Sequence, residues 1–221
     1  MFIFFFIKKH GNSTYIQFAL LLLLGTFILN FFNPNLVAAH AIYVSETDIE
    51  ILKKNDVSIS YCPNRNAKSG RKIAPVYDYL NHSVNVTLGT DGPMSGNHLD
   101  LIGVMNLAPK LQKVKYQDRS ICEAKEILKM ATINGETALR IDDLVGSIEV
   151  GKKADLVMVD SNDVNSFPFY NPISHLIYSA SGKDVSMTMI DGKIVYQNGN
   201  FPTIDIEKVK RAAERYQNKM E

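Results

Sequence analysis

Residues 84–92 read VNVTLGTDG, a short apolar run rich in β-branched residues that ends in a glycine-containing turn. An apolar run bounded by turn residues is typical of a strand that is buried on both faces, as in a parallel sheet. A run of the same kind lies upstream at residues 36–39, and residues 57–61 alternate like a strand. The sequence therefore predicts three strands.

Helical patterns separate these three runs. Ser45 has N-cap chemistry, Asp48 follows three residues later, and Ile49 and Leu52 then mark one apolar face. A second, shorter helix is predicted over residues 74–80. Strand, helix, strand, helix, strand at this spacing indicates successive βα units and a parallel sheet, which is an α/β fold.

Each predicted strand runs into a polar residue, namely His40, Tyr61 or Asp91. Parallel strands place their carboxyl ends at one rim, so these side chains are expected to converge there. A carboxylate and an imidazole at such a rim suit a metal ion and its bound water. The alternative is that His40 is a core histidine and Asp91 a turn former, because Asp-Gly is a common turn pair.

The second half of the chain has a different pattern. A helix is predicted over Ile121–Leu139, a strand over residues 154–160, and a charged helix over residues 206–220. Between them, residues 185–190 and 193–196 alternate on either side of an Asp-Gly pair, which is a strong hairpin signal. This predicts a small antiparallel unit that is distinct from the βα part.

Composition limits the classes of function. The chain has 221 residues, with Lys+Arg 24 against Asp+Glu 23 and a formal net charge of +1. No basic field is available for phosphate backbones, so nucleic-acid binding is not expected. The two cysteines, Cys62 and Cys122, form neither a disulfide framework nor a zinc knuckle.

The first forty residues are unusually apolar, above all residues 16–32. A helix of this length is only marginally long enough to span a bilayer. A membrane anchor, a secretory signal and a buried core helix are all consistent with this pattern. Cleavage of a signal after Ala41 would remove His40, which argues against secretion of a functional chain.

Several motifs in order along the chain resemble the C-terminal half of the amidohydrolase superfamily of metal-dependent hydrolases. Within that superfamily they are most similar to the methylthioadenosine/S-adenosylhomocysteine deaminases. The motifs are residues 36–41 (LVAAHA), 60–63 (SYCP), 66–68 (NAK), 73–76 (IAPV), 88–92 (LGTDG), 130–135 (MATING) and 146–156 (GSIEVGKKADL).

The resemblance implies the later βα units of a partial TIM-like (β/α) barrel, joined to a C-terminal segment of a small β-sandwich domain. We accordingly expect an apolar non-family segment and three family regions. They are residues 1–35, the barrel part 36–145, the small β domain 146–200 and a C-terminal helix in 201–221.

The resemblance also implies a site and a reaction. Asp91 matches the family aspartate that ligates Zn²⁺, or another divalent metal such as Fe²⁺, and handles the proton of the attacking water. His40 matches the histidine that sits beside this water, contacts the substrate and stabilises developing charge. The metal lowers the pKa of the water, and hydroxide displaces ammonia from an adenosine-like nucleoside. Tyr61 stands where the family often has histidine, and no catalytic role is assigned to it.

The sequence departs from the family in one large respect, because it has no His-x-His motif to supply two further metal ligands. Its histidines are His10, His40, His82, His98 and His175. One hypothesis is a cytoplasmic deaminase whose site is completed by an N-terminal fragment, with a homo-oligomer as a further expectation. The other is a truncated, inactive remnant or a membrane-tethered scaffold.

Overall fold

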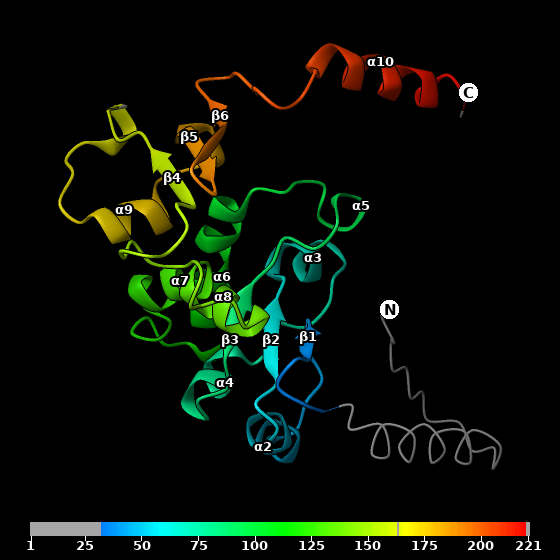
Figure 1. Ribbon diagram of the computed structural model, residues 1–221. Coiled ribbons are helices and arrows are strands. Elements are labelled where there is room, and N and C mark those ends of the chain that lie inside the picture. The colour runs from blue at the N-terminus through cyan, green and yellow to red at the C-terminus, as the bar shows by residue number, and fades with distance from the viewer. Residues whose placement is uncertain (1–31, 163, 220–221) are drawn as a thin grey trace.

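The computed structural model describes residues 32–162 and 164–219, and its first sheet consists of parallel strands (Figure 1). The strands are β1 (Val37–Ala39), β2 (Ser58–Tyr61) and β3 (Val86–Leu88), hydrogen-bonded in that order. The predicted parallel α/β arrangement is therefore confirmed.

Burial explains why these short runs are strands. Ile59 and Val86 are fully buried at 0% exposure, and they face each other in the register of β2 and β3. On the other side, Ala38 of β1 is opposite Ile59. β-Branched side chains pack well on such a two-sided surface, whereas a polar side chain would be desolvated there.

Two of the connecting helices lie where the sequence predicts them. These are α2 (Glu46–Lys54) and α4 (Val76–Asn81). Ser45 caps α2 in a reciprocal capping box, in which its hydroxyl oxygen accepts from the Asp48 N–H at 3.2 Å and the Asp48 carboxylate accepts from the Ser45 N–H at 2.8 Å. This box satisfies N–H groups that the first turn leaves unpaired.

The segment after β2 is helical, although its Pro/Asn/Gly composition predicts a loop. It forms α3 (Pro63–Lys68), with Pro63 in the first turn. Proline is favoured there because its missing N–H is not needed and its φ angle suits a helix. A second short helix, α5 (Pro93–Gly96), begins in the same way after β3.

The predicted single helix over Ile121–Leu139 is wrong in its extent. The chain instead forms α7 (Ala124–Met130) and α8 (Ile133–Leu139), which are separated at Thr132. Thr132 has φ −130° and ψ −109°, and its hydroxyl donates to the Leu128 carbonyl at 2.8 Å. This side-chain bond competes with the helical pattern and ends the first helix.

The longest helix among the described residues was not expected from the sequence. It is α6 (Leu101–Tyr116), which Asp100 caps by accepting from the Gly103 N–H at 3.0 Å. Figure 1 shows α6, α7 and α8 grouped on one side of the sheet, and all three contact β3. These helices provide most of the cover for the buried strands.

The second sheet is antiparallel, as predicted, in the order β4-β5-β6. Its strands are β4 (Leu156–Val159), β5 (Val185–Ile190) and β6 (Lys193–Gln197). The β5–β6 turn has Asp191 at φ 50° and Gly192 at φ 74°, the left-handed pair that a tight hairpin requires. In the described part of the chain these strands form a single sheet, and a second layer of a sandwich is not seen.

The remaining elements lie between and after these strands. Between β4 and β5 are the 3₁₀ helix η1 (Val164–Ser166), α9 (Pro172–Tyr178) and the 3₁₀ helix η2 (Gly182–Asp184). The C-terminal helix α10 (Ile206–Gln217) is close to its predicted position. Figure 1 shows α10 away from both sheets, and none of its residues is buried.

The predicted N-terminal apolar segment, residues 16–32, lies outside the described residues except for Phe32. Within residues 32–162 and 164–219, no helix combines the length and the apolar character that a membrane span needs.

The two cysteines lead to a prediction about thiol chemistry. Both are free and buried. Burial, reinforced by the Glu126 carboxylate, raises the pKa of the Cys122 thiol from 9.0 to about 12. Burial also raises the pKa of Cys62. Because the thiolate is the nucleophile, we expect alkylation by iodoacetamide at pH 8 to be roughly a hundredfold slower in the folded chain than in urea.

The same shift predicts the direction of a pH effect on stability. An unfolded thiol ionises near its ordinary pKa, whereas the folded Cys122 thiol keeps its proton until about pH 12. Its contribution to the free energy of unfolding is therefore complete below pH 9 and is lost as the pH rises towards 12.

The alkylation rates of the two cysteines are measured by mass spectrometry. Equal rates with and without urea would show that the thiols are not buried.

Candidate active site

The candidate site lies where the strands of the parallel sheet end. His40 follows β1 and donates its backbone N–H to the Ser60 carbonyl of β2 at 2.9 Å. His40, Ala41 and Asp91 have left-handed φ angles of 70°, 38° and 60°. Such angles are uncommon for residues other than glycine, and they turn the chain sharply at the rim of the sheet.

The structure brings the two sequence-predicted site residues together. The His40 Nε2 atom is 3.5 Å from the Asp91 Oδ2 atom. The other carboxylate oxygen of Asp91, Oδ1, accepts the backbone N–H of Gly92 at 2.6 Å. The imidazole and the carboxylate thus share one rim, as the parallel arrangement predicts, although they come from strands that are not adjacent.

A third group, Arg65, belongs to the same cluster. Its Nε atom on α3 is 3.5 Å from the Asp91 Oδ2 atom. The side chains of Arg65, His40 and Asp91 are 22%, 19% and 27% exposed, so all three are sheltered but reachable from solvent. Asp91 therefore faces one permanent cation and one titratable imidazole.

The environment of His40 favours its neutral form. Burial is the largest cause of a lowered pKa, and Arg65 and Arg71 act in the same direction. The Asp91 carboxylate opposes them. Because the pKa of His40 lies below 6.5, the imidazole is mostly uncharged at pH 7 and is able to donate or accept a proton.

Polar atoms without partners collect beside this cluster. The buried His40 Nδ1 atom has no hydrogen-bond partner among the described residues, and neither does the amide nitrogen or oxygen of Asn66. Asn66 is only 2% exposed. Buried polar groups are normally paired, so this concentration of unused hydrogen-bonding groups marks an incomplete polar site.

The loop after β3 is fastened to α3. The Asn64 side-chain amide donates to the Gly96 carbonyl at 3.1 Å and lies 2.6 Å from the His98 Nε2 atom. Lys68 hydrogen-bonds the side chain of Asn97. Both ends of α3 therefore hold the loop after β3, and His98 contacts α3 rather than Asp91.

Tyr61 takes no part in this cluster. It is 1% exposed, and its hydroxyl accepts from the Gln112 side-chain amide at 3.2 Å. Burial raises the pKa of Tyr61 well above its ordinary value. The Tyr61 hydroxyl is thus committed to the core.

The residues present do not by themselves complete a zinc site. In the described ranges, 32–162 and 164–219, no group of three or more His, Cys, Asp or Glu side chains is arranged to hold a metal ion. A catalytic zinc ion normally takes three protein ligands. Among the described residues at this rim, Asp91 offers a single carboxylate to such an ion.

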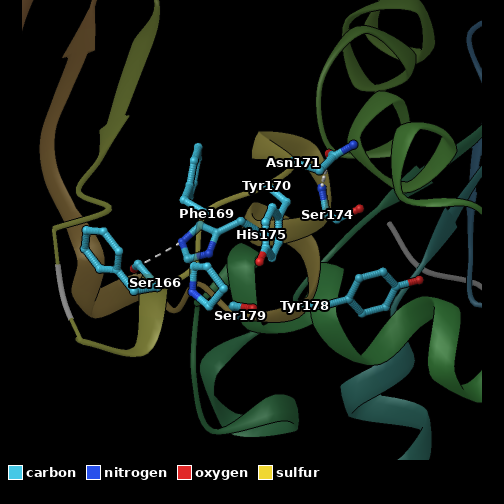
Figure 2. Close-up of a pocket in the computed structure, with 10 residues that line it drawn as sticks. Ser166, Phe169, Tyr170, Asn171, Ser174, His175, Tyr178 and Ser179 are labelled. Carbon is cyan, nitrogen blue, oxygen red and sulfur yellow. Dashed lines mark hydrogen bonds between the residues drawn. The ribbon is translucent and has the colours of Figure 1, made fainter.

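Figure 2 shows a cavity of about 350 Å³ in a different part of the fold, lined by η1, α9 and the loop between them. Phe169 lies against the His175 ring, with 5.1 Å between the ring centroids. The His175 Nε2 atom is 3.5 Å from the Ser166 hydroxyl. Neither His40 nor Asp91 lines this cavity, and we assign it no part in their site.

Comparison with known proteins identifies the family of this chain. A model of the amidohydrolase family matches residues 1–195 of the 221-residue chain. The chain belongs to the amidohydrolase family. The matched range includes both strand ends that carry His40 and Asp91.

Characterised members of the amidohydrolase family include close sequence relatives of this chain. A 5-methylthioadenosine/S-adenosylhomocysteine deaminase of Thermoanaerobacter pseudethanolicus is 45% identical over 184 residues, covering 83% of this chain and 43% of the relative. A 5'-deoxyadenosine deaminase of Methanobrevibacter smithii is 41% identical over 188 residues, covering 85% and 43%. The chain thus spans less than half the length of these relatives.

Solved amidohydrolase-like structures agree with the fold. An adenosine deaminase from Xanthomonas campestris with bound zinc superposes with a TM-score of 0.84 at 32% identity, over 89% of this chain and 45% of that one. The atrazine chlorohydrolase TrzN from Arthrobacter aurescens has a TM-score of 0.77 at 22% identity, over 83% and 41%. The second likeness supports the fold alone.

The sequence pattern does not identify Arg65 or Asn66 as members of the site, and Asn66 stands out only as part of the motif at residues 66–68. Both lie in a segment whose composition reads as a loop, and their approach to His40 and Asp91 depends on α3. The local signal was Pro63 directly after a predicted strand, which is a favoured helix start.

Proposed function

We propose that this chain carries one part of the active site of a metal-dependent deaminase that acts on an adenosine-like nucleoside. The observation that carries the proposal is the 3.5 Å contact between His40 and Asp91 at the rim of the parallel sheet. The names of the relatives support 5'-methylthioadenosine, S-adenosylhomocysteine and 5'-deoxyadenosine as substrates to test. The zinc in the Xanthomonas campestris structure supports a divalent metal as cofactor.

The roles of this chain's residues follow from their protonation. In hydrolytic deamination, the oxygen of water bonds to the amino-bearing ring carbon and the bond from that carbon to nitrogen breaks. The Asp91 carboxylate accepts a proton from the water and returns it to the departing nitrogen, which leaves as ammonia. The neutral His40 imidazole, which contacts the substrate in this proposal, donates a hydrogen bond from Nε2 to the oxygen as charge develops.

The proposal also extends to the architecture. In it, β1, β2 and β3 are the later strands of a partial (β/α) barrel over residues 36–145. The sheet β4-β5-β6 then belongs to a small β-sandwich domain over residues 146–200, and α10 lies in the separate segment 201–221. On β4, Val157 is 59% exposed and lies on the face opposite to that of the buried Met187, which supports a missing layer apposed to that face.

The partner in this proposal is a polypeptide that supplies the His-x-His ligands and the earlier strands. The unpaired Asn66 and His40 atoms support such a completion, because they would otherwise remain desolvated without partners. A second copy of the chain lacks the His-x-His motif, so a homo-oligomer alone would not supply it. The proposed location of the chain is the cytoplasm.

A complementation assay tests this function. The full chain, mixed with the amino-terminal part of the Thermoanaerobacter pseudethanolicus deaminase and Zn²⁺, is expected to release ammonia from 5'-methylthioadenosine or S-adenosylhomocysteine. Neither polypeptide alone is expected to do so. Complex formation without turnover of any of the three nucleosides would contradict the proposal and favour an inactive remnant.

A further inference from the structure

Asp91 has a cationic neighbour that is fixed by the fold. The Arg65 Nε atom and the His40 Nε2 atom each lie 3.5 Å from the same carboxylate oxygen, Oδ2. The Arg65 guanidinium therefore balances the negative charge of the Asp91 carboxylate. A guanidinium keeps its charge at every pH that a folded protein survives.

Contacts along α3 hold Arg65 in this position. Pro63 at the start of the helix is buried. Asn64 and Lys68, on either side of Arg65, both bind the loop after β3. The Asn66 backbone N–H donates to the Cys62 carbonyl at 3.1 Å. Arg65 is therefore presented to Asp91 by a short helix that is tied down at both ends.

This arrangement conflicts with metal binding at the same carboxylate. A divalent ion and a guanidinium are both positive, and two like charges a few ångströms apart in a sheltered site repel each other strongly. A carboxylate already neutralised by arginine also has less free energy to gain from a metal ion. Which of the two cations pairs with the Asp91 carboxylate depends on how many other ligands bind the metal ion.

We propose that Arg65 is a built-in counter-cation of Asp91 that competes with a divalent metal ion for its carboxylate. The inference deepens the proposed function, since it rests on Asp91 as a metal ligand. Arg65 is then a positioning residue, because it orients the Asp91 carboxylate while the other metal ligands are absent. Arg65 also lowers the affinity of the Asp91 carboxylate for a divalent metal ion, until further ligands from the complementing polypeptide offset the repulsion.

Cobalt titration of the complemented chain tests the competition. Metal-free wild type, Arg65→Met, Asp91→Asn and the double variant are each mixed with the amino-terminal part of the Thermoanaerobacter pseudethanolicus deaminase, which supplies the missing ligands, and are titrated with Co²⁺ by calorimetry at pH 7.5. Arg65→Met is expected to bind Co²⁺ about tenfold or more tightly than wild type, because a unit charge near the ligand is gone. Asp91→Asn and the double variant are expected to lose this binding.

Two matched variants separate charge from structure. Arg65→Lys keeps the charge and is expected to stay within about threefold of wild type, since a lysine repels the metal as arginine does. Arg140→Met removes a guanidinium that pairs with Asp56 at 2.6 Å and is expected to leave Co²⁺ binding unchanged. Circular dichroism and urea unfolding confirm that each variant is folded.

The outcomes distinguish this inference from the function on which it rests. Equal affinities of wild type and Arg65→Met, with binding lost in Asp91→Asn, would overturn the competition but leave Asp91 as a ligand. Undiminished binding in Asp91→Asn would remove Asp91 as a ligand, and both the inference and the proposed function would fail. Absence of Co²⁺ binding in both wild type and Arg65→Met would overturn the competition as well.

Discussion

Asp91→Asn is expected to lower the rate of ammonia release by the complemented chain by about 10²- to 10⁴-fold, the usual range for loss of a proton-transfer group. Asparagine keeps the size of the side chain, and its oxygen can still accept the Gly92 N–H. It cannot take a proton from water at neutral pH. The variant therefore tests proton transfer rather than folding.

A matched carboxylate elsewhere provides the control. Asp56 also pairs with an arginine, Arg140, at 2.6 Å, but it lies before β2 and not at the rim. Asp56→Asn is expected to leave the turnover rate within about twofold of wild type, because surface ion pairs contribute little. A similar loss of activity in both variants would assign the Asp91 effect to general destabilisation.

Gln112→Leu is expected to lower the free energy of unfolding by about 3 kcal/mol, since it leaves several buried groups without partners. Gln112 is 0% exposed. Its amide donates to the Tyr61 hydroxyl at 3.2 Å and to the Ala74 carbonyl at 3.0 Å, and its oxygen accepts from the Tyr77 N–H at 3.4 Å. Urea unfolding followed by circular dichroism measures the change.

Asn66→Leu is the contrasting variant. Asn66 is almost as buried, at 2% exposure, but its side-chain amide has no partner among the described residues. Replacing an unpaired buried amide with an apolar side chain of similar size is expected to change stability by less than about 1 kcal/mol. A loss as large as that of Gln112→Leu would mean that the Asn66 amide is paired in the isolated chain.

The strands could be predicted because their sequence signal is local. Val86 and Ile59 belong to short apolar runs, and burial on both faces requires such runs. The helices α3 and α6 were missed for two different reasons. The first has a loop-like composition. The second contains Pro109 and buries the polar Gln112, so its apolar face is poorly marked.

The site could be predicted only in part. His40 and Asp91 end parallel strands, so topology alone brings them to one rim. Arg65 and Asn66 reach them through tertiary packing of α3, which strand periodicity does not encode. The helix break at Thr132 was likewise invisible, because it depends on a side-chain bond to Leu128.

The central claim is that Asp91, with His40 beside it, is the part of a metal-dependent active site that this chain contributes. Zinc anomalous scattering from crystals of the complemented chain tests it most directly. The account predicts a single strong peak within about 2.2 Å of a carboxylate oxygen of Asp91, the usual zinc–carboxylate distance. A fully occupied zinc peak in that complex, bound by other residues and away from Asp91, would contradict it.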